Sequence, residues 1–200
     1  MKKFILGTKQ NMTQYWDEDG KVSPATVVVA GPVTVTQVKT DDKDGYTALQ
    51  VGYGEQKKER LSKSVLGHTK DTAYKTLREF RAEDAKSVGD IIDVSAFEKG
   101  DMVVVAGISK GKGFQGVVKR HGFHGDKRTH GRKHSERKPG SIGGGLRNRV
   151  PQGMRMAGRM GNDRVSVKNL EVLLVDKATN TILIKGALPG RKGTLLEITA

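Results

Sequence analysis

Residues 110–164 carry most of the positive charge of this chain and little of its hydrophobic bulk. The segment holds fifteen Lys and Arg against three Asp and Glu, in a chain whose formal net charge is +14. It also holds thirteen of the 26 glycines but two aromatic residues, Phe114 and Phe123. So few apolar side chains cannot offset the entropy that the segment would lose on folding alone. We therefore expect a folded body that carries a long cationic arm.

Dense positive charge on a glycine-rich backbone indicates a polyanionic partner. Lys and Arg side chains that neutralise phosphates release counterions, which favours binding to nucleic acid. An anionic membrane surface is the other partner that such a charge suits. Membrane binding usually requires a basic amphipathic helix, and the glycine spacing of the arm excludes one. The sequence thus predicts a nucleic-acid partner and no membrane partner.

Size and cysteine content narrow the class of protein further. Two hundred residues suit one domain with a large insertion. The chain has no cysteine, which excludes disulfides and thiolate metal sites and fits a cytoplasmic setting. The apolar run at residues 4–6 ends at Gly7-Thr8-Lys9, and no stretch approaches the roughly 20 apolar residues that span a bilayer.

The chain outside the arm has the pattern of a mainly β protein. Runs rich in β-branched residues recur between turn formers such as Asp19-Gly20, Gly31-Pro32 and Pro189-Gly190. Short strands joined by tight turns indicate a barrel or a sandwich. The predicted strands cover residues 26–30, 33–38, 47–51, 102–106, 170–175, 181–184 and 194–198.

One segment departs from this β pattern. Asp71 is a suitable N-cap, and Tyr74, Leu77 and Phe80 follow it at helical spacing, which predicts a helix over residues 72–82. We assign this helix to an α+β insertion. The predicted division of the chain is a body of residues 1–55, 91–119 and 164–200, an insertion of residues 56–90 and an arm of residues 120–163.

The segment from Gly111 to Gly116 matches the G-x-G-x-x-G pattern of dinucleotide sites. In those sites a helix begins at the third glycine and holds the pyrophosphate. Here a β-like pair, Val117-Val118, and a basic run broken by glycine follow, and no βαβ unit is visible. We interpret the glycines as letting the backbone approach a phosphate chain closely, and we expect no cofactor and no small-molecule substrate.

Four histidines in the arm allow more than one interpretation. Structural zinc sites with four histidines and no cysteine are uncommon, and the surrounding cations oppose a divalent ion, so we expect no metal. No nucleophile and base have a recognisable context, although an enzyme that acts on RNA through His121 or His134 is an alternative. We favour histidines that stack on bases or contact phosphates.

The predicted RNA contacts are cations and histidines of the basic segment at residues 110–164, with one aromatic residue and one serine. Arg outnumbers Lys in the second half of the arm, which suits bidentate phosphate contacts and stacking. The phosphate candidates are Lys110, Lys112, Lys119, Arg120, Lys127, Arg128, Arg132, Lys133, Arg137, Lys138, Arg147, Arg149, Arg155 and Arg159. The stacking candidates are His121, Phe123, His124, His130 and His134, and Ser141 completes the set.

Several strings of the sequence resemble the family of large-subunit ribosomal protein number three, bacterial type. In the basic segment of residues 110–164 they are GKGFQGVVKR (111–120), KPGSIG (138–143) and MAGRMGN (156–162). In the body they are NMTQ (11–14), VTQVKT (35–40), DGY (44–46) and KGALPG (185–190). The likeness covers essentially the whole chain in order. One departure is Gly144-Gly145-Leu146, where relatives often carry a glutamine that is methylated in some, so the resemblance does not imply such a modification here.

The resemblance implies a six-stranded, translation-factor-like β-barrel with an α+β insertion and a long basic extended loop. It implies a non-catalytic structural constituent of the large ribosomal subunit, in the cytoplasm as part of the ribosome. The loop would enter the large-subunit ribosomal RNA, reach toward the peptidyl transferase centre and support early assembly. Neighbouring large-subunit ribosomal proteins would be further partners. A free RNA-binding or RNA-chaperone protein is the alternative.

Overall fold

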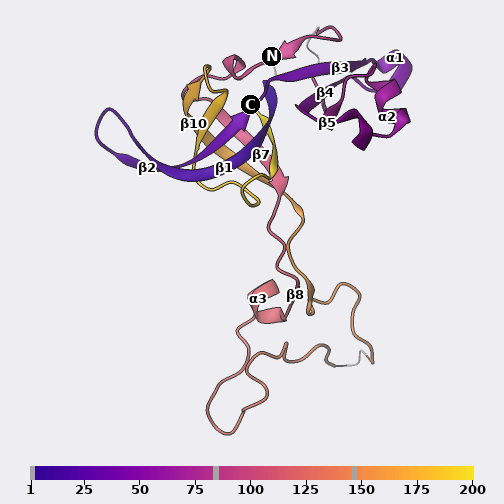
Figure 1. The fold of residues 1–200 in the computed structure, drawn as a ribbon. Helices are drawn as coiled ribbons and strands as arrows, with labels where there is room; N and C mark the ends of the chain where they lie inside the picture. Colours follow the sequence, from indigo (N-terminus) through magenta and orange to yellow (C-terminus); the bar gives the residue numbers. More distant parts are fainter. Residues whose placement is uncertain (1–2, 83–85, 146–147) are drawn as a thin grey trace. The chain divides into compact units, whose positions relative to one another are not determined.

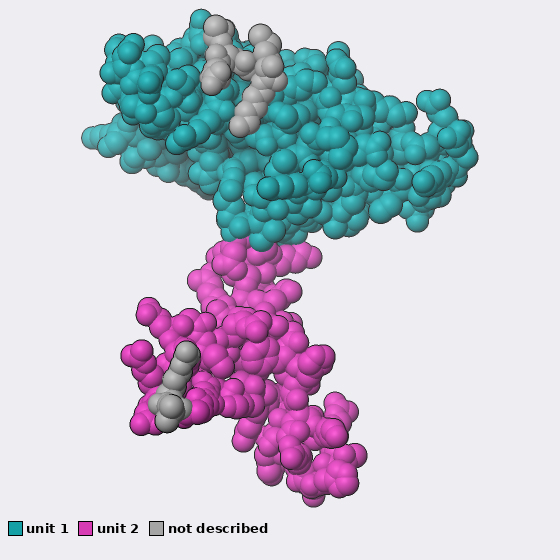
Figure 2. All heavy atoms as spheres, turned by 180° about the vertical axis from the view of Figure 1, so that it is seen from behind, with its two compact units in different colours: residues 1–108, 164–200 teal, residues 109–163 magenta. Residues whose placement is uncertain are grey.

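A computed structural model of the chain describes residues 3–82, 86–145 and 148–200 (Figure 1). The chain forms two compact units, one made of Met1–Ile108 and Arg164–Ala200 and the other of Ser109–Asp163 (Figure 2). We call the first unit the body and the second the arm. In this division the arm consists of residues 109–163, whereas the sequence-based division placed it at residues 120–163.

Six strands of the body close into an antiparallel barrel, as predicted (Figure 1). Their order around the barrel is β1-β12-β7-β10-β11-β2, and each neighbouring pair is antiparallel. The strands are β1 (Phe4–Trp16), β2 (Val22–Ala30), β7 (Met102–Ile108), β10 (Arg164–Asp176), β11 (Thr181–Lys185) and β12 (Leu195–Thr199).

A second sheet of four strands makes up the rest of the body, in the order β5-β4-β3-β6. The strands are β3 (Val33–Lys39), β4 (Ala48–Glu55), β5 (Tyr74–Phe80) and β6 (Ile91–Ile92). The short helices of the body are α1 (Asp41–Asp44), η1 (Lys58–Arg60), α2 (Lys63–His68) and η2 (Val94–Ala96). The predicted strands at 33–38 and 47–51 therefore belong to this sheet and not to the barrel.

The helix predicted over residues 72–82 is wrong. That segment is strand β5, which pairs with β4 from Leu49 opposite Phe80 to Glu55 opposite Tyr74. The ring of Phe80 stacks on that of Phe4 at 4.6 Å between centroids. Tertiary pairing and burial have overridden the helical spacing, as happens often for short segments. The helix of this region is α2, which Ser62 caps by accepting the Val65 N–H at 3.4 Å.

One hydrophobic core holds the barrel and the second sheet together. Inward side chains alternate along the barrel strands, as in Val103 and Val105 of β7 or Ile182 and Ile184 of β11. The second sheet adds residues such as Leu49 to the same cluster. All the described residues of this cluster belong to the body, which thus has a core of its own. Within the described residues, no helix has the length and apolar character needed to cross a membrane.

Three short elements lie in the described part of the arm, residues 109–145 and 148–163. Strand β8 (Phe114–Gln115) pairs with β9 (Gly158–Arg159), and helix α3 (Val117–His121) follows β8 directly. Val117 is the one buried hydrophobic side chain among the described residues of the arm. The shape of the arm consequently depends on hydrogen bonds, ion pairs and glycine turns rather than on an apolar core.

Candidate nucleic-acid interface

The arm concentrates the positive charge of the chain. It contains fourteen Lys and Arg against three Asp and Glu. Its first and last residues form the stem, in which the Ser109 N–H donates to the Asp163 carbonyl and the Lys112 N–H to the Met160 carbonyl, both at 2.9 Å. The pairing of β8 with β9 continues the stem. The rest of the arm is therefore a closed loop that begins and ends at one place.

Close approach of the two stem segments requires glycine at position 161. Gly161 has a φ of 76°, in the left-handed region. A Cβ there would lie 2.2 Å from the carbonyl oxygen of Lys110, which is a severe backbone clash. The glycine content of the arm thus has a structural role where the two segments meet.

The sequence-based expectation of a β-like pair at Val117-Val118 is wrong, because these residues begin helix α3. Gly116 enters it in an extended conformation, and Gly122 ends it with a φ of 73°. Basic side chains in a last turn interact favourably with the free carbonyls at a helix C-terminus. The last turn here carries three of the predicted contacts: Lys119, Arg120 and His121.

A helix therefore does begin after the third glycine of the G-x-G-x-x-G pattern. It is five residues long. Strand β7, which precedes the pattern, pairs antiparallel with both β10 and β12, so the pattern does not lie in a βαβ unit. The surroundings are those of a basic loop on an antiparallel barrel, unlike those of a dinucleotide site.

The C-terminal end of α3 is clamped to the returning chain at Met156. Arg120 donates from Nη1 to the Met156 carbonyl at 2.8 Å, and His121 Nε2 lies 3.1 Å from the same oxygen. Because a carbonyl oxygen only accepts, a hydrogen bond at this distance requires the Nε2 of His121 to be the donor. The Phe123 ring lies 6.1 Å from the His121 ring and 5.2 Å from the Arg155 guanidinium. These four predicted contacts thus hold the arm in shape.

Two of the three acidic residues of the arm fasten a loop beyond this clamp. Arg132 pairs with Asp126 at 2.5 Å, and Arg128 pairs with Glu136 at 3.2 Å. The Asp126 N–H also donates to the Glu136 carbonyl at 3.2 Å. Arg132 lowers the pKa of the Asp126 carboxyl by donating to it, and the Lys127 N–H adds to this effect. Both arginines have an internal partner before any phosphate approaches.

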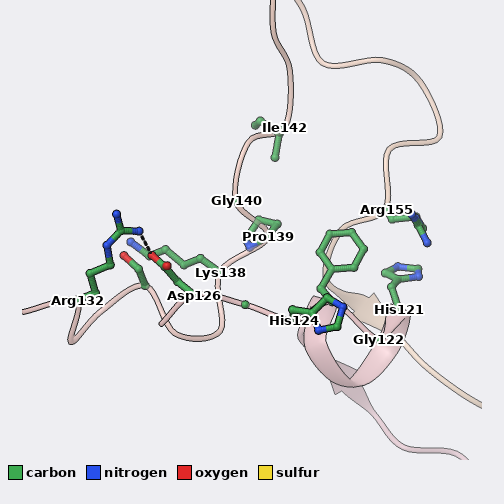
Figure 3. A pocket seen from close by; sticks show the side chains of 13 residues that line it. His121, Gly122, His124, Asp126, Arg132, Lys138, Pro139, Gly140, Ile142 and Arg155 are labelled. Atoms are coloured by element: carbon green, nitrogen blue, oxygen red, sulfur yellow. Dashed lines mark hydrogen bonds and ion pairs between the residues drawn. The ribbon is translucent and has the colours of Figure 1, made fainter. Parts of the chain in front are cut away.

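A hollow of about 790 Å³ lies between the clamp and this loop (Figure 3). In Figure 3 the Asp126–Arg132 pair stands on one side, with His121 and Arg155 on the other. The hollow mixes cations with apolar surface, which suits a nucleotide better than a bare phosphate. Its lining is His121, Gly122, Phe123, His124, Gly125, Asp126, Arg132, Ser135, Lys138, Pro139, Gly140, Ile142 and Arg155.

A second hollow, of about 550 Å³, lies at the stem. Four of its residues are Lys or Arg and one is Asp, so its charge favours a phosphate group. It brings together predicted contacts from both ends of the arm, which are far apart in sequence. The lining is Ser109, Lys110, Lys112, Arg120, His121, Arg159, Met160, Gly161 and Asp163.

The other predicted contacts are exposed along the loops of the arm: Lys127, His130, Lys133, His134, Arg137, Ser141 and Arg149. In the described part of the arm, Arg128 and Arg132 are the cations within ion-pairing distance of a carboxylate. Arg147 lies outside the described residues. Over residues 3–82, 86–145 and 148–200, no three His, Asp or Glu side chains gather as a metal site would require.

Sequence reasoning missed Phe114 as a candidate contact. This side chain is 76% exposed, which is unusual for an aromatic residue, whereas Phe123, the predicted stacking residue, is partly buried in the clamp. The available signal was the position of Phe114 in Gly-Lys-Gly-Phe-Gln-Gly, a run that contains no other apolar side chain.

Comparison with known proteins identifies close relatives. The profile of the family described as "Ribosomal protein L3" matches residues 78–182. The protein named large ribosomal subunit protein uL3 of Herpetosiphon aurantiacus is 49% identical over 200 residues, which cover 98% of this chain and 94% of the relative. The proteins of the same name from Thermosynechococcus vestitus and Nocardia farcinica are each 50% identical, over 98% and 97% of this chain and 94% and 90% of their own.

Proposed function

The chain belongs to the ribosomal protein L3 family, and on that basis we propose that it is a structural constituent of the large ribosomal subunit that binds large-subunit ribosomal RNA through its arm. The observation that carries this proposal is the charge of the arm. Fourteen cations face three acids, and two of the acids are already paired within the arm. Such an excess of positive charge on an element without a core favours binding to a polyanion.

Members of this family are structural components of the ribosome and not enzymes, so the histidines of the arm serve structure and binding. His121 illustrates this role, since its Nε2 is used to hold the Met156 carbonyl. The protein would reside in the cytoplasm with the ribosome. Its other partners would be neighbouring large-subunit proteins.

We extend the proposal to the position of the arm in the particle. An arm with one buried hydrophobic residue among those described gains little by folding against itself and much by lying within folded RNA. Its exposed loops would enter the RNA toward the peptidyl transferase centre and neutralise phosphates there. The same contacts would support early assembly of the subunit, because they bring together RNA segments that repel one another.

The experiment that tests this proposal is sedimentation of the chain with ribosomal particles in high salt. A constituent of the large subunit should remain with the large-subunit peak, since its arm is enclosed by RNA. A free RNA-binding or chaperone protein would be released, because exposed phosphate contacts weaken steeply as salt rises. Release of the chain at the salt concentration that strips loosely bound proteins would overturn the proposal.

A further inference from the structure

Phe114 is an aromatic side chain of the arm that buries little of its surface. It lies in β8 and is 76% exposed. The other aromatic residue of the arm, Phe123, has the Arg155 guanidinium 5.2 Å from its ring and the His121 ring at 6.1 Å. One ring is thus used to hold the arm together and the other is left in solvent.

The pairing of β8 with β9 fixes the side on which the Phe114 ring lies. Phe114 is opposite Arg159, and Gln115 is opposite Gly158, so the two pairs point to opposite faces of this ribbon. The Gly158 face is covered, because a Cβ there would lie 2.6 Å from Arg120 Nη1. The Phe114 face, which it shares with Arg159, has no such cover.

Arg159 connects this ring to the basic hollow at the stem. It is the cross-strand neighbour of Phe114 and also lines the hollow of about 550 Å³, together with Lys110, Lys112 and Arg120. Phe114 itself is outside the lining. The stem therefore offers a flat apolar surface directly beside a cluster of cations.

We propose that Phe114 is a stacking platform for one unpaired nucleobase of RNA, whose phosphate is held in the hollow by Lys112 and Arg159. The proposal rests on the proposed function, since it names the part of the RNA that this point of the arm binds. A base within a duplex is already stacked on both faces, so the ring selects an unpaired base. Cations beside the ring favour a nucleotide over an apolar protein surface.

The test measures the affinity of the full chain for a single-stranded adenylate decamer and for an RNA duplex of the same length. Replacement of the ring by an aliphatic side chain, Phe114→Leu, should weaken binding of the single strand by about 5-fold to 100-fold. It should leave duplex binding and the salt dependence of both unchanged, because no charge is lost. Phe114→Trp should bind the single strand at least as tightly as the unchanged chain does.

Two further variants complete the design. Lys112→Gln combined with Arg159→Gln should flatten the salt dependence by about one to two units on a log–log plot. Ile91→Ala is the matched control, because Ile91 is a 64% exposed apolar side chain of the body, and it should change neither binding constant. All variants should melt at the temperature of the unchanged chain, since the altered side chains are outside the core.

Equal single-strand affinities for the Phe114→Leu variant and the unchanged chain would overturn the proposal. So would a Phe114→Leu variant that binds both RNAs normally but is lost from large-subunit particles, since the ring would then contact a protein. Failure of the proposed function gives a different result, in which the unchanged chain itself binds neither RNA in a salt-dependent manner.

Discussion

At the scale of single residues, the arm uses its few acids and several of its glycines to define a shape that its composition alone would not hold. Asp126 and Glu136 each have an arginine partner. Gly161 lets the two stem segments meet. A single substitution can remove the charge of Asp126 or Glu136, or add a side chain at Gly161. The role of each residue can therefore be tested separately.

The Asp126–Arg132 pair predicts a direction of pKa change. The Asp126 carboxyl should titrate below its usual pKa of 3.8 in the folded chain, because Arg132 and then the Lys127 N–H donate to its charged form. The stabilisation of the loop is therefore present above the usual pKa and is lost as the pH falls through the lowered one. In Arg132→Gln the pKa of Asp126 should rise, as NMR titration of the side-chain carboxyl can measure. An unaltered pKa would contradict the pairing.

Substitution of Gly161 tests whether this position requires glycine because of its positive φ or because of the nearby Lys110 carbonyl oxygen. Gly161→Ala should open the stem, because the new Cβ would lie 2.2 Å from the Lys110 carbonyl oxygen. The amide hydrogens of Lys112 and Met160, which bond across the stem, should then exchange faster with solvent. Gly131→Ala is the matched control, since Gly131 has a similar φ of 74° but nothing within 4 Å of its Cβ position. Equal exchange in both variants would mean that the clash is relieved at no cost.

At the scale of elements, the β-branched runs predicted strands well, because each of the seven runs overlaps an observed strand. Strand β1 was not predicted, since after Phe4-Ile5-Leu6 its residues are mostly polar and half of them are exposed. Pairing with β2 and β12 stabilises this segment as a strand, although its composition does not favour one. The helical spacing of Tyr74, Leu77 and Phe80 predicted the wrong element for the same reason. Backbone pairing with β4 determines the conformation of this segment, and the local sequence does not reveal that pairing.

Strands β4 and β5 are paired in one sheet, and the Tyr74 ring of β5 lies against Gly52 of β4. This contact gives a prediction for the body. Gly52→Ala would place a Cβ 2.5 Å from the Tyr74 ring and should lower the free energy of unfolding by roughly 1–3 kcal/mol. Gly67→Ala is the contrasting variant, because Gly67 lies in α2 with nothing within 4 Å and should be neutral or stabilising by up to about 1 kcal/mol. Urea denaturation measures both. A stable Gly52→Ala variant would show that the Tyr74 ring moves aside freely.

The candidate site was predictable from sequence in its chemistry but not in its geometry. Composition alone located the arm, because a segment rich in cations and glycine and poor in apolar side chains cannot fold alone. The clamp joins Arg120 to Met156, and the stem hollow joins Lys112 to Arg159. Such contacts depend on which distant segments pair, and the local pattern around Val117-Val118 did not reveal even the short helix α3. Exposure of Phe114 likewise follows from the pairing of β8 with β9.

At the scale of the whole molecule, the hydrophobic core and the excess positive charge lie in different units of the chain. The body has a hydrophobic core, and the arm has the excess charge. Barrel strands β7 and β10 are the connection, since Ile108 and Arg164 at their ends are opposite each other in the ladder. The arm is thus an insertion between two paired barrel positions.

This separation predicts that charge removal in the arm and in the body has unequal effects. Lys127→Gln combined with Lys133→Gln should flatten the log–log dependence of RNA affinity on salt by about one to two units, because each phosphate contact contributes roughly 0.7–0.9. Lys57→Gln combined with Lys58→Gln removes the same charge from exposed positions of the body and should leave the slope nearly unchanged. Equal slopes for the two double variants would mean that the RNA contacts the body as much as the arm.

The most direct test is the RNA affinity of a chain in which residues 109–163 are replaced by a short Gly-Ser turn. Ile108 and Arg164 are cross-strand partners, so a turn can join them, and a shorter loop changes closure entropy little. Cooperative melting near the temperature of the full chain would establish that the body is folded. We predict that this folded body has lost nearly all salt-dependent affinity for large-subunit ribosomal RNA. A folded body that binds the RNA as tightly as the full chain would contradict the account.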